Sequence, residues 1–327
     1  MWNTRAKVPL PKMNYFIGFD GGGTKTEAVL LDARGQLAGR GLGGPSNPLR
    51  VGFEPAFANL RSAAEKALSA ARADAKQVRG VCAGLAGAGS RRIVKRVMAF
   101  LVETFPDADV HVTTDANIAL EAATDGGPGV ILIAGTGSIA LGRNAAGQTV
   151  RAGGMGPWVG DEGSAFDIGR RGVMAVARAR DGLAPVTLLS EMIPAALEIP
   201  NFYSLLERVA ESHEQVFPRI FPLVVDAADL GDDPSREILF TAALALSQIA
   251  LSVVRRLNLA DQKFILAKSG GVFGHSELLD GALDALLASG APKVKIQQLE
   301  VSPAVGAARW AMRLTGVPRK AAHGAKA

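Results

Sequence analysis

The chain has 327 residues, of which 48% are hydrophobic, and a formal net charge of +5 at pH 7. Its length and hydrophobic content predict a globular protein of about two domains. The charge is spread along the sequence, so it is compatible with an anionic substrate such as a nucleotide and gives no reason to expect a nucleic acid partner. A single cysteine, Cys82, excludes a disulfide framework or a thiolate metal site within one chain and favours a reducing, cytoplasmic compartment.

Neither end of the chain predicts a targeting signal or ordered structure. Residues 1–14 contain two prolines and no apolar signal region, so we expect a disordered leader, and we expect residues 316–327 to form a disordered tail. The longest apolar stretch, Ile238 to Val254, is interrupted by polar residues and is shorter than a membrane span of about 20 residues. It predicts a buried helix, and no membrane partner is expected.

The stretch from Tyr15 to Glu27, Y-F-I-G-F-D-G-G-G-T-K-T-E, predicts a tight turn between two strands. Because glycine adopts positive φ and lets a ligand approach the backbone, Gly21 to Gly23 could turn their N–H groups toward an anion. The hydroxyls of Thr24 and Thr26 would add donors. Asp20 is well placed to hold a hydrated Mg²⁺ beside a polyphosphate. A glycine-rich hairpin without a ligand fits this motif equally well.

Three strands in a meander, followed by alternating helices and strands, fill the first half of the chain and predict a mixed sheet flanked by helices. The predicted strands are Tyr15–Asp20, Lys25–Leu31, Gln36–Gly41, Val78–Leu85 and Asp109–Thr113, and the predicted helices are Glu54–Ala71 and Ser90–Glu103.

The second half begins with the same order of elements. A strand from Gly129 to Ala134 ends in the turn Gly135-Thr136-Gly137-Ser138, and a short strand leads to a turn whose glycine, Gly147, matches Gly35 of the first half. This repeat predicts two domains of one topology.

Further along, a Gly-rich stretch from Gly153 to Ser164 leads into a series of helices and a third glycine turn, Ser269 to Phe273. The predicted helices are Ala165–Arg180, Leu188–Leu197, Phe202–Glu214, Arg236–Asn258, Ser276–Ala288 and Ala304–Leu314, and the predicted strands are Lys263–Ala267 and Val294–Gln298.

Four short motifs, in this order and spacing, resemble those of the N-acetylglucosamine kinase and BadF/BadG/BcrA/BcrD group of the sugar kinase, Hsp70 and actin superfamily. They are D-G-G-G-T at Asp20, G-T-G-S at Gly135, G-D-E-G-S at Gly160 and S-G-G-V-F at Ser269. The resemblance implies an α/β protein with two ribonuclease H-like domains of the actin-like ATPase fold that close around a nucleotide. We expect the domains to span residues 15–118 and 119–302, with a last helix, 303–315, that packs back on the first domain.

The resemblance also implies where ATP binds. Asp20, Gly22, Gly23 and Thr24 match a first phosphate loop, and Thr136 and Gly137 match a second. Gly270 and Gly271 match the turn beneath the adenine and ribose. His275 follows this turn and could line the nucleotide, although a lone histidine before a helix is more often a surface residue.

Asp115 matches the catalytic aspartate of the family. A carboxylate beside a sugar hydroxyl can accept its proton while the γ-phosphoryl group of ATP is transferred. The same residue would also serve as an N-cap for a helix that starts at Ala116. These two roles do not exclude each other.

The remaining matches imply a sugar site. Asp161 matches the acid that binds sugar hydroxyls. Asn47 matches a sugar-binding asparagine, although Ser46-Asn47-Pro48 could equally be an ordinary turn. The other expected substrate contacts are Ser138, Gly154, Met155 and Gly156.

The expected activity is ATP- and Mg²⁺-dependent phosphorylation of the 6-hydroxyl of N-acetylglucosamine by a homodimer, with a glucosamine kinase as the alternative. A redox activator ATPase of the broader family would need cysteines to share an iron–sulfur cluster, and Cys82 stands alone. A non-catalytic sugar sensor would carry a DNA-binding segment, for which the residues before Met13 are too few.

Overall fold

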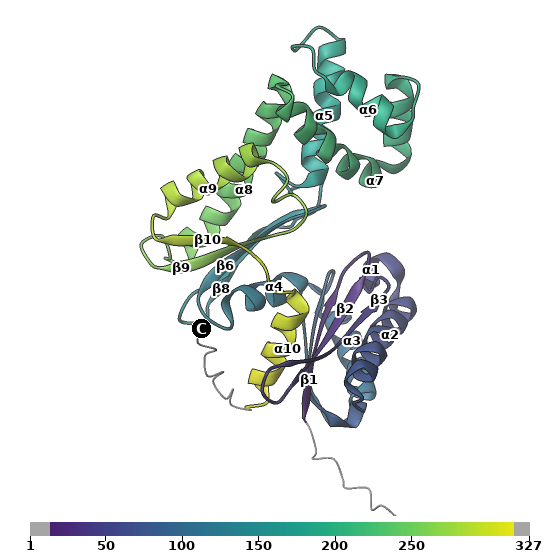
Figure 1. Cartoon of the computed structure of the whole chain (residues 1–327), viewed down its shortest axis with the longest axis vertical. Coiled ribbons are helices and arrows are strands. Elements are labelled where there is room, and N and C mark those ends of the chain that lie inside the picture. Colours follow the sequence, from purple (N-terminus) through teal and green to yellow (C-terminus); the bar gives the residue numbers. More distant parts are fainter. Residues whose placement is uncertain (1–13, 317–327) are drawn as a thin grey trace, which may run out of the picture. The chain divides into compact units, whose positions relative to one another are not determined.

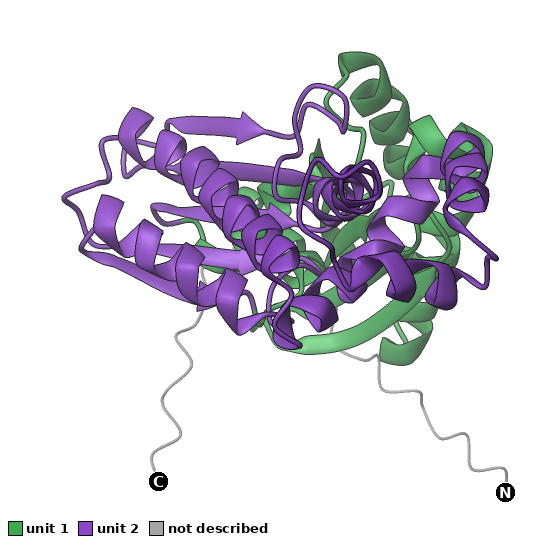
Figure 2. Ribbon diagram, turned by 90° about the horizontal axis from the view of Figure 1, so that it is seen from above, with its two compact units in different colours: residues 1–126, 300–327 green, residues 127–299 purple. Residues whose placement is uncertain are grey.

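The computed structural model describes residues 14–316, which form two compact units (Figure 2). The chain passes from unit 1 to unit 2 between Gly126 and Gly127 and returns between Leu299 and Glu300. The expected boundary at residues 118/119 falls inside a helix of unit 1, so it differs from the division found in the structure. Apart from Asn14 and Gly316, the expected leader and tail lie outside the described residues.

Unit 1 contains a five-stranded mixed sheet in the order β3-β2-β1-β4-β5. The pairs β1/β2 and β2/β3 are antiparallel, whereas β1/β4 and β4/β5 are parallel. This arrangement confirms the predicted meander and the predicted mixed sheet. The strands are β1 (Tyr15–Gly21), β2 (Thr26–Asp32), β3 (Leu37–Gly43), β4 (Val78–Leu85) and β5 (Asp109–Thr113).

Helices lie on both faces of this sheet. α2 buries small and apolar side chains at a spacing of three to four residues, from Ala56 to Ala67, against β2 and β3. The last helix packs on β1, β4 and α4, and Figure 1 shows it beside α4 and β1. Gly18 permits this approach, since a Cβ there would lie 2.2 Å from the carbonyl oxygen of Ala304. The helical segments are α1 (Pro48–Val51), α2 (Phe53–Ala71), the 3₁₀ turn η1 (Ala75–Gln77), α3 (Arg91–Thr104), α4 (Asp115–Thr124) and α10 (Pro303–Leu314).

Unit 2 repeats the sheet topology of unit 1, with the order β10-β9-β6-β7-β8. Its first three strands pair antiparallel, and β9 and β10 extend the sheet in parallel from β6. The repeat predicted from the two glycine turns is therefore confirmed. The strands are β6 (Gly129–Ala134), β7 (Ser138–Arg143), β8 (Thr149–Gly153), β9 (Phe264–Ser269) and β10 (Val294–Gln298).

Two helices of unit 2, α7 and α8, are longer than any helix described in unit 1, and α7 was predicted much too short. We expected a helix to end at Glu214, but α7 continues to Asp229 with Pro218 and Pro222 inside it and a kink at Ser212. The helices are α5 (Ala165–Arg180), α6 (Leu189–Leu197), α7 (Phe202–Asp229), α8 (Asp233–Arg256) and α9 (Glu277–Gly290).

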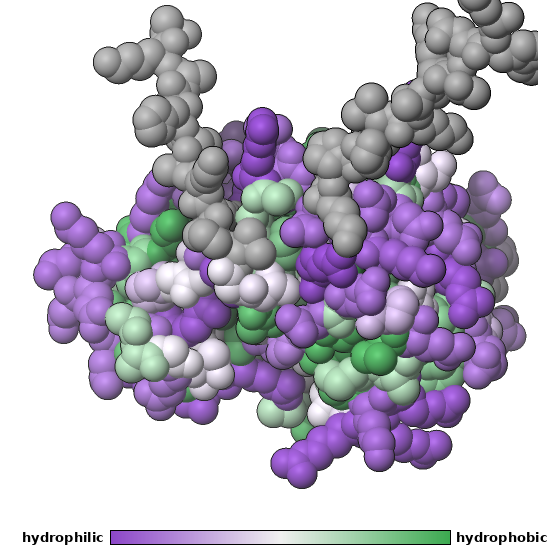
Figure 3. Space-filling view, turned by 90° about the horizontal axis from the view of Figure 1, so that it is seen from below, coloured by the Kyte–Doolittle hydropathy of each residue, from purple (hydrophilic) through white to green (hydrophobic). Residues whose placement is uncertain are grey.

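Within residues 14–316, α8 alone is long and apolar enough to cross a membrane by length and composition. Half of its most apolar window is buried in the protein, and it packs on β6, β7 and β8. These contacts are those of a core helix, as predicted. On the face drawn in Figure 3, hydrophobic residues are interspersed with hydrophilic ones, which is usual for a globular surface.

Candidate functional site

The first glycine turn joins β1 to β2 in unit 1, and several of its polar groups form hydrogen bonds within the protein. The N–H of Gly22 donates to the carbonyl of Lys25 at 2.9 Å, and the carbonyl of Gly22 accepts from Ser46 and Asn47 at 3.0 and 3.1 Å. The Thr26 hydroxyl is buried and bonds to the Gly44 carbonyl and the Ser46 hydroxyl. The expectation that the N–H of Gly22 and the hydroxyl of Thr26 face an anion is therefore wrong.

Backbone conformation corrects a second expectation about this turn. None of Gly21, Gly22 and Gly23 has a positive φ, so the turn does not use the left-handed conformation that glycine permits. Gly21 is required for space, because a Cβ there would lie 2.2 Å from the Leu85 side chain and 2.3 Å from the Ser46 hydroxyl. Gly23 and the exposed Thr24 are left as the part of the turn that a ligand could approach.

Arg50 lies over this turn and was not predicted from the sequence. It belongs to α1, and a Cβ added to Gly23 would lie 2.8 Å from its guanidinium Nη1 atom. The side chain is exposed and brings a positive charge to the glycine turn. The only sequence signal was its position three residues after Asn47.

Asn47 itself caps α1. Its side-chain oxygen accepts the N–H of Leu49 at 3.0 Å, which is the ordinary-turn alternative left open by the sequence. The amide nitrogen of the same side chain can still donate to a ligand.

Two carboxylates, Asp20 and Asp115, stand at the same edge of the unit 1 sheet. Asp20 is the last residue but one of β1, Asp115 follows β5, and these strands run parallel on either side of β4. Burial, together with the negative charge of Asp115, raises the pKa of Asp20 to about 6. Burial also raises the pKa of Asp115. The pair therefore has the perturbed titration that is typical of functional carboxylates.

Asp115 is not the N-cap that the sequence suggested. The cap of α4 is Thr114, whose hydroxyl accepts from Asn117, and Asp115 is the first helical residue. One oxygen of the Asp115 carboxylate accepts the N–H of Ala116 at 2.9 Å. Because Thr114 caps the helix, the other oxygen of Asp115 is not needed for that purpose.

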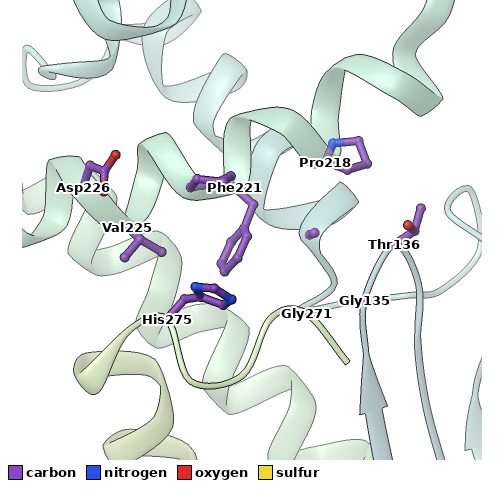
Figure 4. Close-up of a pocket in the computed structure, with 10 residues that line it drawn as sticks. Gly135, Thr136, Pro218, Phe221, Val225, Asp226, Gly271 and His275 are labelled. Atoms are coloured by element: carbon purple, nitrogen blue, oxygen red, sulfur yellow. The ribbon is translucent and has the colours of Figure 1, made fainter. Parts of the chain in front are cut away.

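The second glycine turn joins β6 to β7 in unit 2. The N–H of Gly135 donates to the carbonyl of Gly137 at 2.9 Å, and the carbonyl of Gly135 accepts from Ala165 at the start of α5. Ser138 is buried, and its hydroxyl donates to the carbonyl of Glu162. Thr136 stands at the tip of the turn, as Figure 4 shows.

Asp161 connects this turn to the loop of residues 153–164. Its carboxylate accepts the N–H of Ser138 at 3.2 Å, and a Cβ on Gly137 would lie 2.7 Å from its second oxygen. Burial raises the pKa of Asp161. Its φ of +62° is unusual for a non-glycine residue, and such strain is found where function demands it.

The rest of this loop presents glycine backbone and exposed apolar side chains. Gly153, Gly154 and Gly156 all have positive φ. Met155 is 60% exposed and Trp158 is 73% exposed. The loop therefore offers exposed apolar side chains to a ligand, whereas the Gly154 N–H is taken by the Ser138 carbonyl.

Asp167, a residue that sequence reasoning missed, anchors the end of the loop. Its carboxylate accepts the N–H of Gly163 and the guanidinium groups of Arg170 and Arg171. Burial alone would raise the pKa of Asp167, but these hydrogen bonds outweigh it and lower the pKa. Asp167 lies in the first turn of α5, three residues after the N-cap Ser164, and this spacing is a sequence signal for a helix start.

The third glycine turn follows β9 and borders a cavity of about 470 Å³ within unit 2. A Cβ on Gly270 would lie 2.2 Å from the carbonyl oxygen of Ala134, so this glycine serves strand packing, whereas Gly271 lines the cavity. Figure 4 shows the rings of Phe221 and His275 next to each other at the cavity wall. The ring centres are 6.2 Å apart, and the ring planes are nearly perpendicular. The cavity is lined by Gly135, Thr136, Ala165, Pro218, Phe221, Pro222, Val225, Asp226, Gly271 and His275.

The structure thus places the expected residues in two sets. Unit 1 holds Asp20, Gly22, Gly23, Thr24, Asn47 and Asp115, and unit 2 holds Thr136, Gly137, Ser138, Gly154, Met155, Gly156, Asp161, Gly270, Gly271 and His275. The α7 side of the cavity was missed because the helix was predicted to end before it.

Comparison with known proteins identifies the family. The model of the BadF/BadG/BcrA/BcrD ATPase family matches residues 17–311, nearly the whole described chain. The chain belongs to the BadF/BadG/BcrA/BcrD ATPase family.

Within the BadF/BadG/BcrA/BcrD ATPase family, the chain is similar to sugar kinases along almost its full length. It is 32% identical to the N-acetyl-D-glucosamine kinase of Dictyostelium discoideum, over 91% of this chain and 97% of the relative. It is 30% identical to the N-acetylmuramic acid/N-acetylglucosamine kinase of Clostridium acetobutylicum, over 90% and 97%. A solved structure assigned as an N-acetylglucosamine kinase from Chromobacterium violaceum has a TM-score of 0.71 and 26% identity, over 92% of this chain and all of that one.

Proposed function

We propose that this protein is an ATP-dependent kinase that phosphorylates the 6-hydroxyl of N-acetylglucosamine, giving N-acetylglucosamine 6-phosphate and ADP. The observation that carries the proposal is the full-length similarity to N-acetylglucosamine kinases at 30–32% identity. The buried carboxylates, the glycine turns and the cavity supply residues suited to each part of the reaction.

Asp115 is the proposed general base. The 6-oxygen of the sugar forms a bond to the γ-phosphorus while the bond from this phosphorus to the oxygen of the β-phosphate breaks. The proton of the hydroxyl passes to the Asp115 carboxylate, and ADP leaves. The raised pKa of Asp115 makes it a better proton acceptor than an ordinary aspartate.

The cavity in unit 2 suits the adenine base. Apolar walls from α7 and the exposed backbone of Gly271 would contact the flat faces of a purine, with the rings of Phe221 and His275 beside it. Thr136 and Gly137 in unit 2, and Gly23, Thr24 and Arg50 in unit 1, are the proposed phosphate contacts.

A magnesium ion would be held through water by Asp20. Among residues 14–316 no group of three or more His, Cys, Asp or Glu side chains could bind a metal by itself. A buried carboxylate repelled by Asp115 nevertheless gains from a neighbouring cation, and Mg²⁺ commonly keeps several waters and binds one carboxylate plus phosphates. When bound, the ion would neutralise charge on the triphosphate.

The proposed sugar contacts are Asp161, Asn47 and the loop that carries Met155. An acetamide needs an apolar contact for its methyl group, which the exposed Met155 and Trp158 can offer. Free glucosamine carries an ammonium group instead, and the exposed Glu162 in the same loop would favour it. A glucosamine kinase therefore remains the second candidate.

A redox activator ATPase has less support than either kinase. Burial raises the pKa of the Cys82 thiol to about 12, so this thiol in β4 stays protonated and is a poor cluster ligand. We propose a cytoplasmic kinase, in keeping with a single buried cysteine that forms no disulfide. A homodimer is proposed as well.

A substrate panel tests the proposal. The protein is incubated with ATP, Mg²⁺ and, in turn, glucose, glucosamine, N-acetylglucosamine, N-acetylmannosamine and N-acetylmuramic acid, and ADP release is measured. The proposal predicts the highest kcat/KM for N-acetylglucosamine. ADP release that no sugar stimulates would overturn it.

A further inference from the structure

A buried lysine in unit 2 lies next to the third glycine turn. Lys268 is on β9, between β6 and β10 in the sheet, and is 6% exposed. Its amine donates to Asp280 at 3.0 Å and to Asp284 at 2.8 Å, both on α9. An amine buried in a central strand requires such partners, because an unpaired charge there would be costly.

Both acids favour the charged form of the lysine. Burial alone would lower the pKa of Lys268, but the hydrogen bonds to Asp284 and Asp280 outweigh it and raise the pKa. The ammonium group also lies 5.7 Å from the centre of the Phe273 ring in the glycine turn. The charged form of Lys268 is thus the one that the structure accommodates.

Asp280 makes a contact that Asp284 does not. Its second carboxylate oxygen accepts the N–H of Gly274 at 2.8 Å. Gly274 has a φ of +82° and directly precedes His275, so this bond fixes the end of the turn in a conformation that favours glycine. Gly271, at the start of the turn, and His275, just after it, both line the cavity.

We propose that Asp280 is a positioning residue for nucleotide binding, which holds residues 270–275 in the conformation that forms one wall of the base cavity. This inference rests on the proposed function, since it takes the cavity as the site of the ATP base. Asp280 does not touch the nucleotide. It acts by joining the turn to Lys268 on β9 and to the first turn of α9.

Asp284 provides a matched control. It bonds to the same amine at a similar distance, and within residues 14–316 its hydrogen bond is to Lys268 and not to the turn. Loss of either acid leaves Lys268 with one partner, so both losses should cost stability. Only the loss of Asp280 should release Gly274.

The experiment compares Asp280→Ala, Asp280→Asn and Asp284→Ala with the wild-type full chain by two measurements. Amide hydrogen exchange of residues 270–275 is followed without nucleotide, and KM is determined for ATP and for N-acetylglucosamine. Asp280→Ala should speed exchange in the turn and raise the ATP KM, each by about tenfold, since a hydrogen bond to a charged group is lost. The sugar KM should change by less than about twofold. Asp284→Ala should leave the exchange rate in the turn and the ATP KM near wild type.

Asp280→Asn keeps an oxygen that can accept from the Gly274 N–H. The exchange rate of its turn and its ATP KM should therefore fall between those of the wild type and those of Asp280→Ala. If Asp280→Ala does not fold, the same two measurements on Asp280→Asn test the inference. Equal exchange in the turn for the Asp280 and Asp284 variants, or an ATP KM unchanged by both Asp280 substitutions, would overturn the inference. Failure of the wild type to use ATP would instead refute the proposed function, while the exchange comparison would still show whether Asp280 holds the turn.

Discussion

Asp161 accepts a hydrogen bond from the backbone N–H of Ser138 at 3.2 Å and so joins the second glycine turn to the loop of residues 153–164. The loop also returns to the turn through the Gly154 N–H, which donates to the Ser138 carbonyl at 2.8 Å. A single carboxylate thus supports a proposed phosphate loop while it belongs to the proposed sugar site. Substitutions at Asp161 can separate these two roles.

Asp161→Asn should raise the sugar KM by about tenfold, because the charge that strengthens hydrogen bonds to sugar hydroxyls is lost. The asparagine oxygen can still accept from Ser138, so the ATP KM should stay within about twofold of wild type. Asp161→Ala removes both interactions and should raise both KM values. Steady-state kinetics with each substrate varied in turn will measure this. A wild-type sugar KM in Asp161→Asn would remove Asp161 from the sugar site.

Asp115→Asn should lower kcat by at least about a hundredfold, which is the usual loss when a general base is removed. Asparagine has nearly the same shape and can keep the hydrogen bond from the Ala116 N–H, so α4 should remain intact. ATP affinity, measured by calorimetry, should change little. A variant with near-normal kcat would assign the base to another residue.

Asp20→Asn should stabilise the protein at neutral pH while it abolishes turnover. The pKa of Asp20 is raised to about 6 in the folded protein, which therefore favours the protonated form. This preference adds to the free energy of unfolding below the ordinary pKa near 3.8, and the contribution is lost as the pH rises through 6. Asparagine avoids this loss, and we expect about 2 kcal/mol of added stability at pH 7.5. The difference should shrink as pH falls from 6 toward 4.

Urea unfolding across this pH range measures the effect, with Glu65→Gln as the control. Glu65 is an exposed carboxylate of unit 1 and should change stability by less than about 0.5 kcal/mol. If Asp20→Asn adds no stability at pH 7.5, or if the added stability persists at pH 4, burial and Asp115 do not disfavour the charged form of Asp20.

Phe221→Leu should raise the ATP KM by about fivefold, because leucine fills the α7 wall but lacks the aromatic ring beside His275. The control is Phe217→Leu, one turn earlier on the same helix. Phe217 packs on Phe166 at 5.0 Å between ring centres and is not among the cavity-lining residues. Similar ATP KM values for the two variants would place the adenine base elsewhere.

Most of the fold could be predicted because its signals are local. Apolar strands that end at glycine turns define both sheets, and the two matching turn glycines, Gly35 and Gly147, indicate the repeat. α7 could not be predicted to its full length, since Pro218 and Pro222 normally end a helix but are accommodated inside this one. The cavity wall that the second half of α7 forms was therefore not predicted either.

The candidate site was only partly predictable for a related reason. Motifs identify Asp20, Asp115 and Asp161, but the hydrogen bonds that form around each of them decide how it is used, and these have no sequence pattern of their own. The Gly22 N–H is taken by Lys25, and Thr114 rather than Asp115 caps α4. Arg50 and the α9 carboxylates carry no motif, so only packing reveals them.

The position of the phosphate group in the product decides whether the chain is a 6-kinase of N-acetylglucosamine. With ATP, Mg²⁺ and N-acetylglucosamine, phosphorus–proton correlation spectra should show the phosphate coupled to the C6 protons, and 6-deoxy-N-acetylglucosamine should yield no product. A phosphate on another oxygen would contradict this assignment, as would a kcat/KM for glucosamine at least about tenfold above that for N-acetylglucosamine.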